Sequence, residues 1–203
     1  MVRDETLDML RRALDRPEAA SSDFDLNPNV VLPEGRKLRP AAVLVAVSET
    51  GNGPEVILTK RSSRLKHHPG QIAFPGGKVE AGDISVEAAA LREAREEIGL
   101  PEGLARVIGT LPPHETVTGF TVQPFVAVLG GDFEVRCEDG EVDEVFRVPL
   151  SHVTDPARFS VQWRRWRGQR RHYYTVPFGP YYIWGATARM LRNLAAAVHA
   201  DAD

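Results

Sequence analysis

The chain has 203 residues and a formal net charge of −3; 42% of its residues are hydrophobic and 26% are charged. This composition is typical of a globular protein with a proper core, and the charge excludes a general attraction to nucleic acid or anionic membranes. No apolar run has the roughly 20 residues of a membrane span, and the N-terminus does not have the pattern of a secretory signal. Cys137 is the one cysteine, so an intrachain disulfide is excluded. We therefore expect a cytoplasmic protein without disulfides.

The N-terminal part of the chain is predicted to be a helix followed by a surface segment. Leucines at a spacing of three and then four predict an amphipathic helix over residues 4–14. Residues 17–40 are rich in Pro, Ser, Asp and Asn, as is typical of a linker that wraps a surface. We therefore expect an N-terminal helix and linker at 1–37 and a compact domain at 38–203.

The compact domain alternates short apolar runs with turn residues, which predicts many strands. A cluster of Gly and Asn at 51–53 suits a hairpin between the first two of them. The predicted strands are residues 41–47, 56–59, 71–74, 105–111, 121–129, 144–148, 161–166 and 169–176, with a helical turn at 149–153 and a C-terminal helix at 182–199. These elements, with one central helix described next, predict a mixed α/β fold, although periodicity alone does not choose its topology.

Residues 74–100 carry the strongest signal of chemistry. They begin with a Gly-Gly pair, interpreted as a turn, and a short acidic loop. A helix is predicted over residues 86–98, because Ser85 suits its N-cap and Gly99 suits the position just after its last turn.

Three carboxylates of this helix, Glu93, Glu96 and Glu97, lie within one arc of roughly 100°. A separate apolar stripe of Leu91, Ala94 and Ile98 can pack on a core. Like charges one turn apart destabilise an isolated helix by about a few tenths of a kcal/mol. A hard divalent cation such as Mg²⁺ or Mn²⁺ would offset this repulsion, whereas the alternative is a solvated helix face with i,i+4 ion pairs.

The stretch resembles the Nudix box, which combines a glycine, an acid and an R-E-x-x-E-E-x-G core. The corresponding residues here are Gly77, Asp83 and the run from Arg92 to Gly99. Asp83 stands where the family has Glu, and its spacing to Arg92 is one residue longer. The resemblance implies the Nudix fold, an α/β/α sandwich around a mixed β-sheet, and metal-dependent hydrolysis of nucleoside diphosphates.

The same resemblance implies roles for the box residues. For Mg²⁺ or Mn²⁺ as cofactor, Glu93 and Glu97, one turn apart, are the first choice of ligands, and Glu96 would be a further ligand or a water-bridged one. The resemblance adds the backbone carbonyl of Gly77. Arg92 lies i,i+4 from Glu96 and would hold the carboxylates in place. Glu93 would bind the metal, activate the attacking water, or do both.

The segment upstream of the box, residues 57–77, resembles the additional motif of coenzyme A pyrophosphatases, a Nudix subfamily. The matching positions are Leu58, Thr59, Arg61, Ser62, Leu65, His68, Gly70 and Phe74 to Gly77. Residues 182–189 also resemble the last helix of that subfamily. The resemblance implies hydrolysis of CoA or acyl-CoA to 3′,5′-ADP and (acyl-)4′-phosphopantetheine. The predicted substrate-binding residues are Arg61, Ser62, His68, Gly70 and Phe74 of the motif, together with Arg64 of the basic cluster described next.

Charge supports the same kind of substrate. A basic cluster just before the acidic helix can hold the phosphates that a metal leaves unneutralised; its alternative is a solvated loop. The cluster consists of Lys60, Arg61, Arg64, Lys66, His67 and His68. We assign His68 to substrate positioning, not to proton transfer.

Several residues keep two interpretations. Glu141 and Glu144 would be either an additional acid of the site or a surface loop, and His114 and Glu115 would either line the pocket or lie outside it. The arginine- and aromatic-rich hairpin at 161–176 would be an exposed hairpin, a pocket wall or dimer contact, or an RNA site. Trp184 and Tyr182 are predicted to be core residues, with a platform for an adenine base as the alternative.

Three functions are therefore weighed. The first is a CoA or acyl-CoA pyrophosphatase acting on a small nucleotide substrate, without nucleic-acid or membrane partners and with a homodimer as one option. The second is hydrolysis of another nucleoside diphosphate linked to X, such as ADP-ribose or NADH. The third is a non-catalytic nucleotide- or RNA-binding Nudix module, against which the intact Arg92, Glu93, Glu96 and Glu97 argue.

Overall fold

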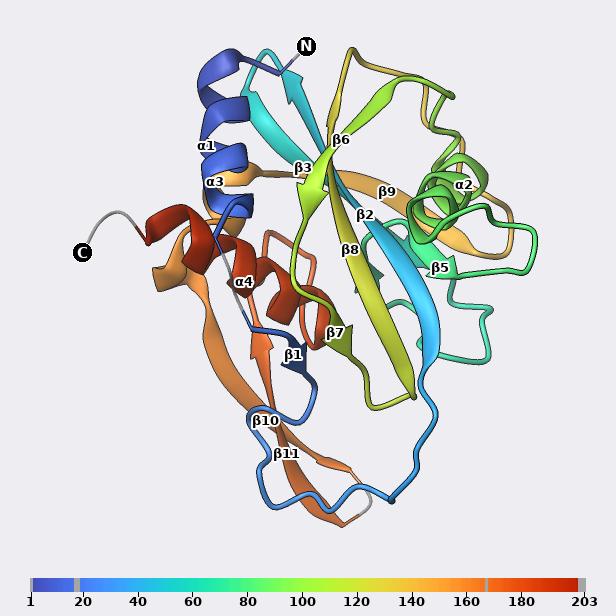
Figure 1. The fold of residues 1–203 in the computed structure, drawn as a ribbon, viewed down its shortest axis with the longest axis vertical. Coiled ribbons are helices and arrows are strands. Elements are labelled where there is room, and N and C mark those ends of the chain that lie inside the picture. Colours follow the sequence, from blue (N-terminus) through green and yellow to red (C-terminus); the bar gives the residue numbers. More distant parts are fainter. Residues whose placement is uncertain (1, 17–18, 167, 201–203) are drawn as a thin grey trace.

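The structure, a computed structural model, describes residues 2–16, 19–166 and 168–200. Figure 1 shows a twisted sheet with helices on both sides. The helices are α1 (Asp4–Leu14), α2 (Val86–Ile98), α3 (Leu150–Val153), η1 (Pro156–Arg158) and α4 (Ala186–His199). The strands are β1 (Ser21–Ser22), β2 (Arg39–Thr50), β3 (Gly53–Arg61), β4 (Ile72–Ala73), β5 (Gly76–Lys78), β6 (Ala105–Thr110), β7 (His114–Glu115), β8 (Phe120–Leu129), β9 (Val142–Pro149), β10 (Ser160–Trp166) and β11 (Gln169–Thr175).

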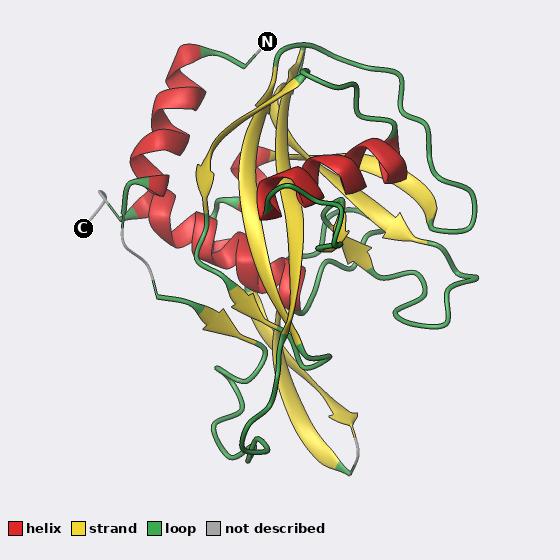
Figure 2. Cartoon of the chain, turned by 45° about the vertical axis from the view of Figure 1, so that its right-hand side comes forward, coloured by secondary structure: helices red, strands yellow, loops and turns green. Residues whose placement is uncertain are grey.

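The sheet is mixed and has β2 at its centre. Its strand order is β1-β7-β8-β2-β3-β4, while β5 pairs with β2, β6 with β8 and β9 with β3. The pairs β2–β8 and β1–β7 are parallel and the others are antiparallel. β10 and β11 form a separate antiparallel hairpin that projects from the lower end of the molecule (Figure 2).

Strand β2 buries both faces, as its continuous apolar run predicts. Successive side chains point to opposite faces of a strand, so Leu44 joins the hydrophobic cluster under α2, and Val45 joins the cluster under α1 and α4. Figure 1 shows α2 on one side of β2 and β8, and α1 and α4 on the other. The expected α/β arrangement, with helices on both faces of a mixed sheet, is confirmed.

The predicted start of the last helix is wrong by four residues. Tyr182 to Gly185 are not helical, because Trp184 forms a β-bridge with Thr175 and Gly185 has a left-handed φ of 65°. α4 therefore begins at Ala186. Tyr182 is 45% exposed, so its assignment to the core is also wrong.

The Gly-Gly pair is a strand, not the expected turn. Gly76 and Gly77 pair with Val43 and Ala42 of β2 as part of β5. A Cβ on Gly76 would lie 2.3 Å from the carbonyl oxygen of Ala42, and its φ is 153°. Glycine at this position is what lets β5 approach β2 so closely.

The segment before β2 is fastened to the rest of the fold. β1 pairs with β7, and the Asn27 side chain exchanges hydrogen bonds of 3.0 and 2.8 Å with the carbonyl and N–H of His172 in β11. The division at residues 37 and 38 stays a prediction. No helix among the described residues is long and apolar enough to cross a membrane.

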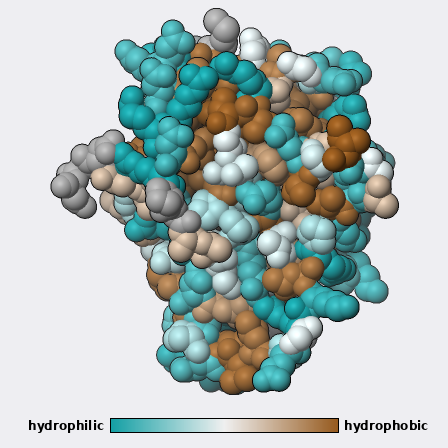
Figure 3. All heavy atoms as spheres, in the orientation of Figure 1, coloured by the Kyte–Doolittle hydropathy of each residue, from teal (hydrophilic) through white to brown (hydrophobic). Residues whose placement is uncertain are grey.

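The molecular surface is polar over α1 and more hydrophobic at the lower end, where the hairpin and the segment before β2 lie (Figure 3). Val31, Val161 and Trp163 are exposed large hydrophobic residues of these two segments. The hairpin therefore exposes hydrophobic as well as polar side chains, and some of its other residues line the cavity described next.

Candidate active site

Helix α2 presents the carboxylates because its ends and its packing face are both well defined. Its predicted bounds are confirmed: the Ser85 side chain accepts a hydrogen bond of 3.0 Å from the N–H of Ala88, and Gly99 has a φ of 71° at the C-terminus. Ala90 and Ala94 are buried against the sheet. These small side chains allow close packing, which leaves the glutamates facing β5 and solvent.

Arg92 binds the acids around it. Its Nε and Nη2 donate to the two carboxylate oxygens of Asp83 at 2.9 and 3.1 Å. Its Nη1 donates to Glu93 at 3.1 Å and to Glu96 at 2.8 Å, and Nη2 also reaches the carbonyl of Lys78 at 3.1 Å. Hydrogen bonds from Arg92 hold the pKa of Asp83 below its usual range. Asp83 therefore anchors Arg92, despite its unusual identity and spacing.

Glu97 is a buried carboxylate at the junction of α2 and β5. It accepts a hydrogen bond of 3.0 Å from the N–H of Gly76, and the Arg61 guanidinium lies 3.9 Å from its other oxygen. Burial raises the pKa of Glu97 to about 7, and repulsion from Glu93 and Glu141 adds to this increase. Burial likewise raises the pKa of Glu93.

The structure distinguishes the two acids, Glu141 and Glu144, whose roles the sequence left open. The charge of Glu141, just before β9, contributes to the raised pKa values of Glu93 and Glu97. Glu144 instead accepts a hydrogen bond from the hydroxyl of Tyr181, whose ring stacks on Phe146 with centroids 3.6 Å apart. Glu144 thus has a structural contact.

Gly77 gives Glu93 its space. A Cβ on Gly77 would lie 2.4 Å from one Glu93 carboxylate oxygen, so the carboxylate occupies the space that any larger residue would fill. Within the described ranges no three His, Cys, Asp or Glu side chains are already gathered as a metal site. The donors nevertheless suit a hard divalent cation, because they are carboxylate oxygens that repel one another. They lie beside Gly77, where only glycine leaves room for the Glu93 carboxylate.

A cavity of about 230 Å³ lies beside Arg61, on the side of the sheet covered by α4. Three of the predicted substrate-binding residues, Arg61, His68 and Phe74, line it. His68 has a left-handed φ of 55°, which is uncommon for a residue other than glycine.

The other three predicted substrate-binding residues lie outside the cavity lining. The N–H of Ser62, which is fully buried, donates to the carbonyl of Glu141 at 2.7 Å. Arg64 is exposed and ion-paired with Asp139. Gly70 has a φ of 69° and donates its N–H to the carbonyl of Arg61 at 3.0 Å. These residues shape the loop that carries Arg61 and His68.

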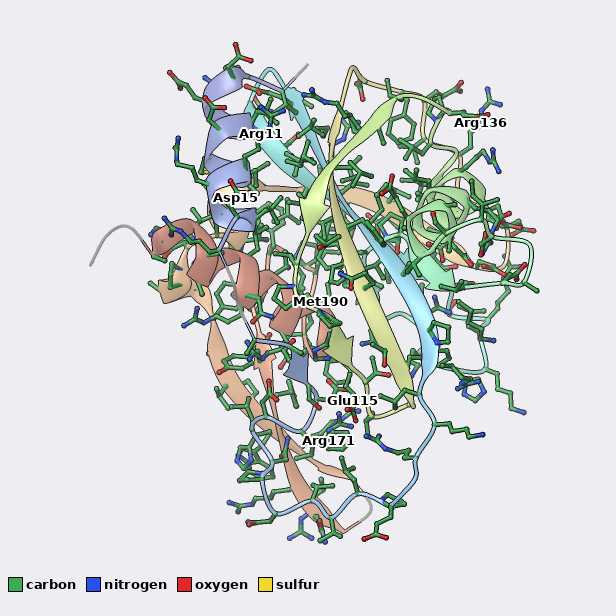
Figure 4. The ribbon with its side chains drawn as sticks, viewed as in Figure 1. Arg11, Asp15, Glu115, Arg136, Arg171 and Met190 are labelled. Carbon is green, nitrogen blue, oxygen red and sulfur yellow. The ribbon has the colours of Figure 1, made fainter. Side chains whose placement is uncertain are left out.

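The hairpin supplies a wall of the cavity, one of its three open interpretations. Residues distant in sequence that line the cavity are Asp23, Arg164, Arg171, Tyr173 and Trp184. Figure 4 places Arg171 of β11 below Met190 of α4, another lining residue. Arg167 of the hairpin lies outside the described residues. The aromatic and arginine content of the hairpin was the signal, but sequence alone could not say which side chains face inward.

A buried polar network holds this wall in place. The Asn193 amide donates to the Ser21 hydroxyl at 3.2 Å, and Ser21 lies 2.9 Å from Nδ1 of His114. Nε2 of His114 lies 3.4 Å from one carboxylate oxygen of Asp23, and the other oxygen forms an ion pair of 3.1 Å with Arg171. Burial opposes ionisation of Asp23, but the hydrogen bond from His114 and its other partners lower its pKa. His114 is completely buried, so it supports the pocket without lining it.

We expect His114→Ala to destabilise the fold by about 1–3 kcal/mol, because it removes a completely buried side chain together with its contacts to Ser21 and Asp23. The free energy of unfolding in urea measures this effect. The matched control is His199→Ala, which removes an exposed histidine from the end of α4. Equal stability of the two variants would contradict a structural role for the network.

This site, with its glycine strand against a carboxylate helix, defines a class of enzyme. Over residues 37–167 the chain matches the NUDIX domain, and it belongs to that family. It is a Nudix hydrolase, of the general class that hydrolyses a nucleoside diphosphate linked to another group, and its fold is the Nudix fold.

Named relatives and a solved structure are similar to it. The "Uncharacterized Nudix hydrolase NudL" of Enterobacter sp. (strain 638) is 40% identical over 160 residues, which are 79% of this chain and 83% of that protein. The protein of the same name from Citrobacter koseri is 40% identical over 177 residues, which cover 87% and 92%. The crystal structure of the Nudix hydrolase RenU from M. smegmatis is 24% identical, covers 58% of this chain and 74% of that one, and has a TM-score of 0.49.

Proposed function

We propose that this Nudix hydrolase cleaves the diphosphate of coenzyme A or of an acyl-CoA. Water adds across a phosphorus–oxygen bond of the diphosphate, so the products are 3′,5′-ADP and (acyl-)4′-phosphopantetheine. The observation that carries the proposal is the position of Arg61: this residue of the upstream motif lines the cavity and lies 3.9 Å from Glu97 of the box helix. The two sequence patterns thus meet at one place.

The cofactor in this proposal is Mg²⁺ or Mn²⁺, since Nudix hydrolases generally use such cations. Glu93, Glu96, Glu97 and the carbonyl of Gly77 would hold it. When bound, such a cation lowers the pKa of water and neutralises phosphoryl oxygens. The donor set supports this choice, because Mg²⁺ and Mn²⁺ prefer carboxylate and carbonyl oxygens.

The protein's own residues would position the reacting groups. Arg92 orients Glu93 and Glu96 through its hydrogen bonds, and the N–H of Gly76 orients Glu97. Arg61 offers a positive charge between Glu97 and the cavity, where it can pair with a phosphate of the substrate. His68 and Phe74 would contact the substrate within the cavity, while Ser62, Arg64 and Gly70 would act through the shape of their loop.

A substrate panel tests the proposal. With Mg²⁺ or Mn²⁺, kcat/KM for CoA or an acyl-CoA is expected to exceed that for ADP-ribose, NADH and diadenosine polyphosphates by at least about tenfold, the discrimination that a few pocket contacts provide. Separation of the products by chromatography should show 3′,5′-ADP, and EDTA should abolish turnover.

The same panel separates the alternatives. If CoA is among the poorest substrates, the CoA proposal fails, and the best substrate identifies the other nucleoside diphosphate that the enzyme cleaves. If no diphosphate is hydrolysed with either cation, the catalytic assignment of the box residues fails as well.

A further inference from the structure

The guanidinium of Arg164 stacks over the Trp184 ring at the cavity wall. The guanidinium carbon of Arg164 lies 4.3 Å from the centre of the Trp184 ring. The Tyr173 ring meets Trp184 edge-on, with centroids 5.1 Å apart. All three residues line the cavity. Nucleobases stack well on aromatic rings and on guanidinium planes, so this wall suits a planar base.

Arg164 also carries a positive charge that no ion pair within the described part of the chain neutralises. Of the arginines lining the cavity, Arg61 lies near Glu97 and Arg171 pairs with Asp23. For Arg164, in contrast, no ion pair within 4.0 Å is found among residues 2–16, 19–166 and 168–200. An arginine without such an ion pair, beside a site proposed to cleave a diphosphate, is suited to binding an anionic group of the ligand.

The surroundings of His68 agree with an excess of positive charge in the cavity. Burial lowers the pKa of His68, and the charges of Arg61, His67 and Arg164 lower it further, against a hydrogen bond with Gln71. An additional anion in the cavity would relieve this repulsion between cations.

We propose that Arg164 is a specificity-determining residue that binds a second phosphate on the nucleoside end of the substrate, with the base lying against Arg164 and Trp184. This inference rests on the proposed function, since it places the nucleoside 3′-phosphate of CoA at Arg164. The pantetheine end of the substrate has neither an aromatic ring nor a charge for these two side chains to recognise. Arg164 thus distinguishes nucleotides with the extra phosphate from those without it.

The neighbouring residue provides a matched control. Side chains alternate between the two faces of a strand, and Arg165 of β10 does not line the cavity. Arg164 lies opposite Arg171 in the hairpin, whereas Arg165 lies opposite Arg170. Arg164→Gln and Arg165→Gln therefore remove the same charge from the same strand, one on the cavity side and one on the other.

Binding of two nucleotides that differ by one phosphate tests the inference without requiring turnover. Calorimetric titration with 3′,5′-ADP and 5′-AMP is expected to show that the wild-type protein binds 3′,5′-ADP about 10- to 100-fold more tightly, as one hydrogen-bonded charge pair allows. Arg164→Gln should lose this preference, and Arg165→Gln should keep it. In parallel, Arg164→Gln should lower kcat/KM much more for CoA than for 3′-dephospho-CoA, which loses only the contact between its base and Arg164.

Failure of this inference can be distinguished from failure of the proposed function. If Arg164→Gln weakens both nucleotides equally, or if the wild-type protein does not prefer 3′,5′-ADP, the role of Arg164 is overturned even where CoA is a good substrate. If CoA is a poor substrate but the preference depends on Arg164, the inference stands and the CoA assignment fails.

Discussion

Replacing Glu97 by Gln is expected to lower kcat for diphosphate hydrolysis by more than about 100-fold, beyond the range seen for groups that only orient metal ligands. The substitution keeps the shape of the side chain and an oxygen that can accept from the N–H of Gly76. It removes the negative charge that we assign to cation binding. Initial rates at saturating Mg²⁺ measure the loss.

The Glu97→Gln variant should be at least as stable as the wild-type protein. Because the folded-state pKa of Glu97 is raised to about 7, its ionisation opposes folding increasingly as the pH rises from the unfolded value of 4.5 to 7. A neutral amide avoids this opposition, so Tm at pH 7.5 in EDTA should be equal or higher.

Two further variants complete this test. Glu87→Gln changes an exposed glutamate in the first turn of α2 and should retain full activity. Glu93→Gln should be impaired like Glu97→Gln. If both Glu93→Gln and Glu97→Gln hydrolyse substrate at nearly the wild-type rate with saturating Mg²⁺, these carboxylates do not form the metal site.

Gly77→Ala is expected to lower kcat by about 10- to 100-fold, like changes next to metal ligands in general, while the protein remains folded. The added methyl group would lie 2.4 Å from a Glu93 carboxylate oxygen, so this carboxylate has to move. The flexible end of Glu93 can do so without disturbing the backbone. The experiment compares kcat with Tm for the same variant.

Gly82→Ala is the control for Gly77→Ala, because a Cβ on Gly82 meets no atom within 4 Å. Gly76→Ala would not be informative, since its Cβ meets the backbone of β2 and the fold itself would suffer. Wild-type kcat in Gly77→Ala would show that the position of the Glu93 carboxylate does not matter for the reaction.

The carboxylate helix could be predicted from sequence because its signals are local. A side-chain cap at Ser85, a 3.6-residue spacing of acids and a glycine at its end act within α2 itself, and its bounds agree with the structure. The start of α4 could not be predicted in this way. The apolar spacing continues upstream of Ala186, but pairing of Trp184 with Thr175 holds those residues in an extended conformation.

The residues that line the cavity show the same difference between what local sequence predicts and what tertiary contacts decide. Arg61, His68 and Phe74 were predicted as substrate-binding residues because they lie in a continuous motif. Asp23 and Arg164 were not, because they line the cavity only after β1 has paired with β7 and the hairpin has folded against α4. The residue pattern thus predicts the groups that we assign to diphosphate hydrolysis, because they are close in the chain. The shape and charge of the pocket arise from contacts between distant segments, which no local pattern encodes.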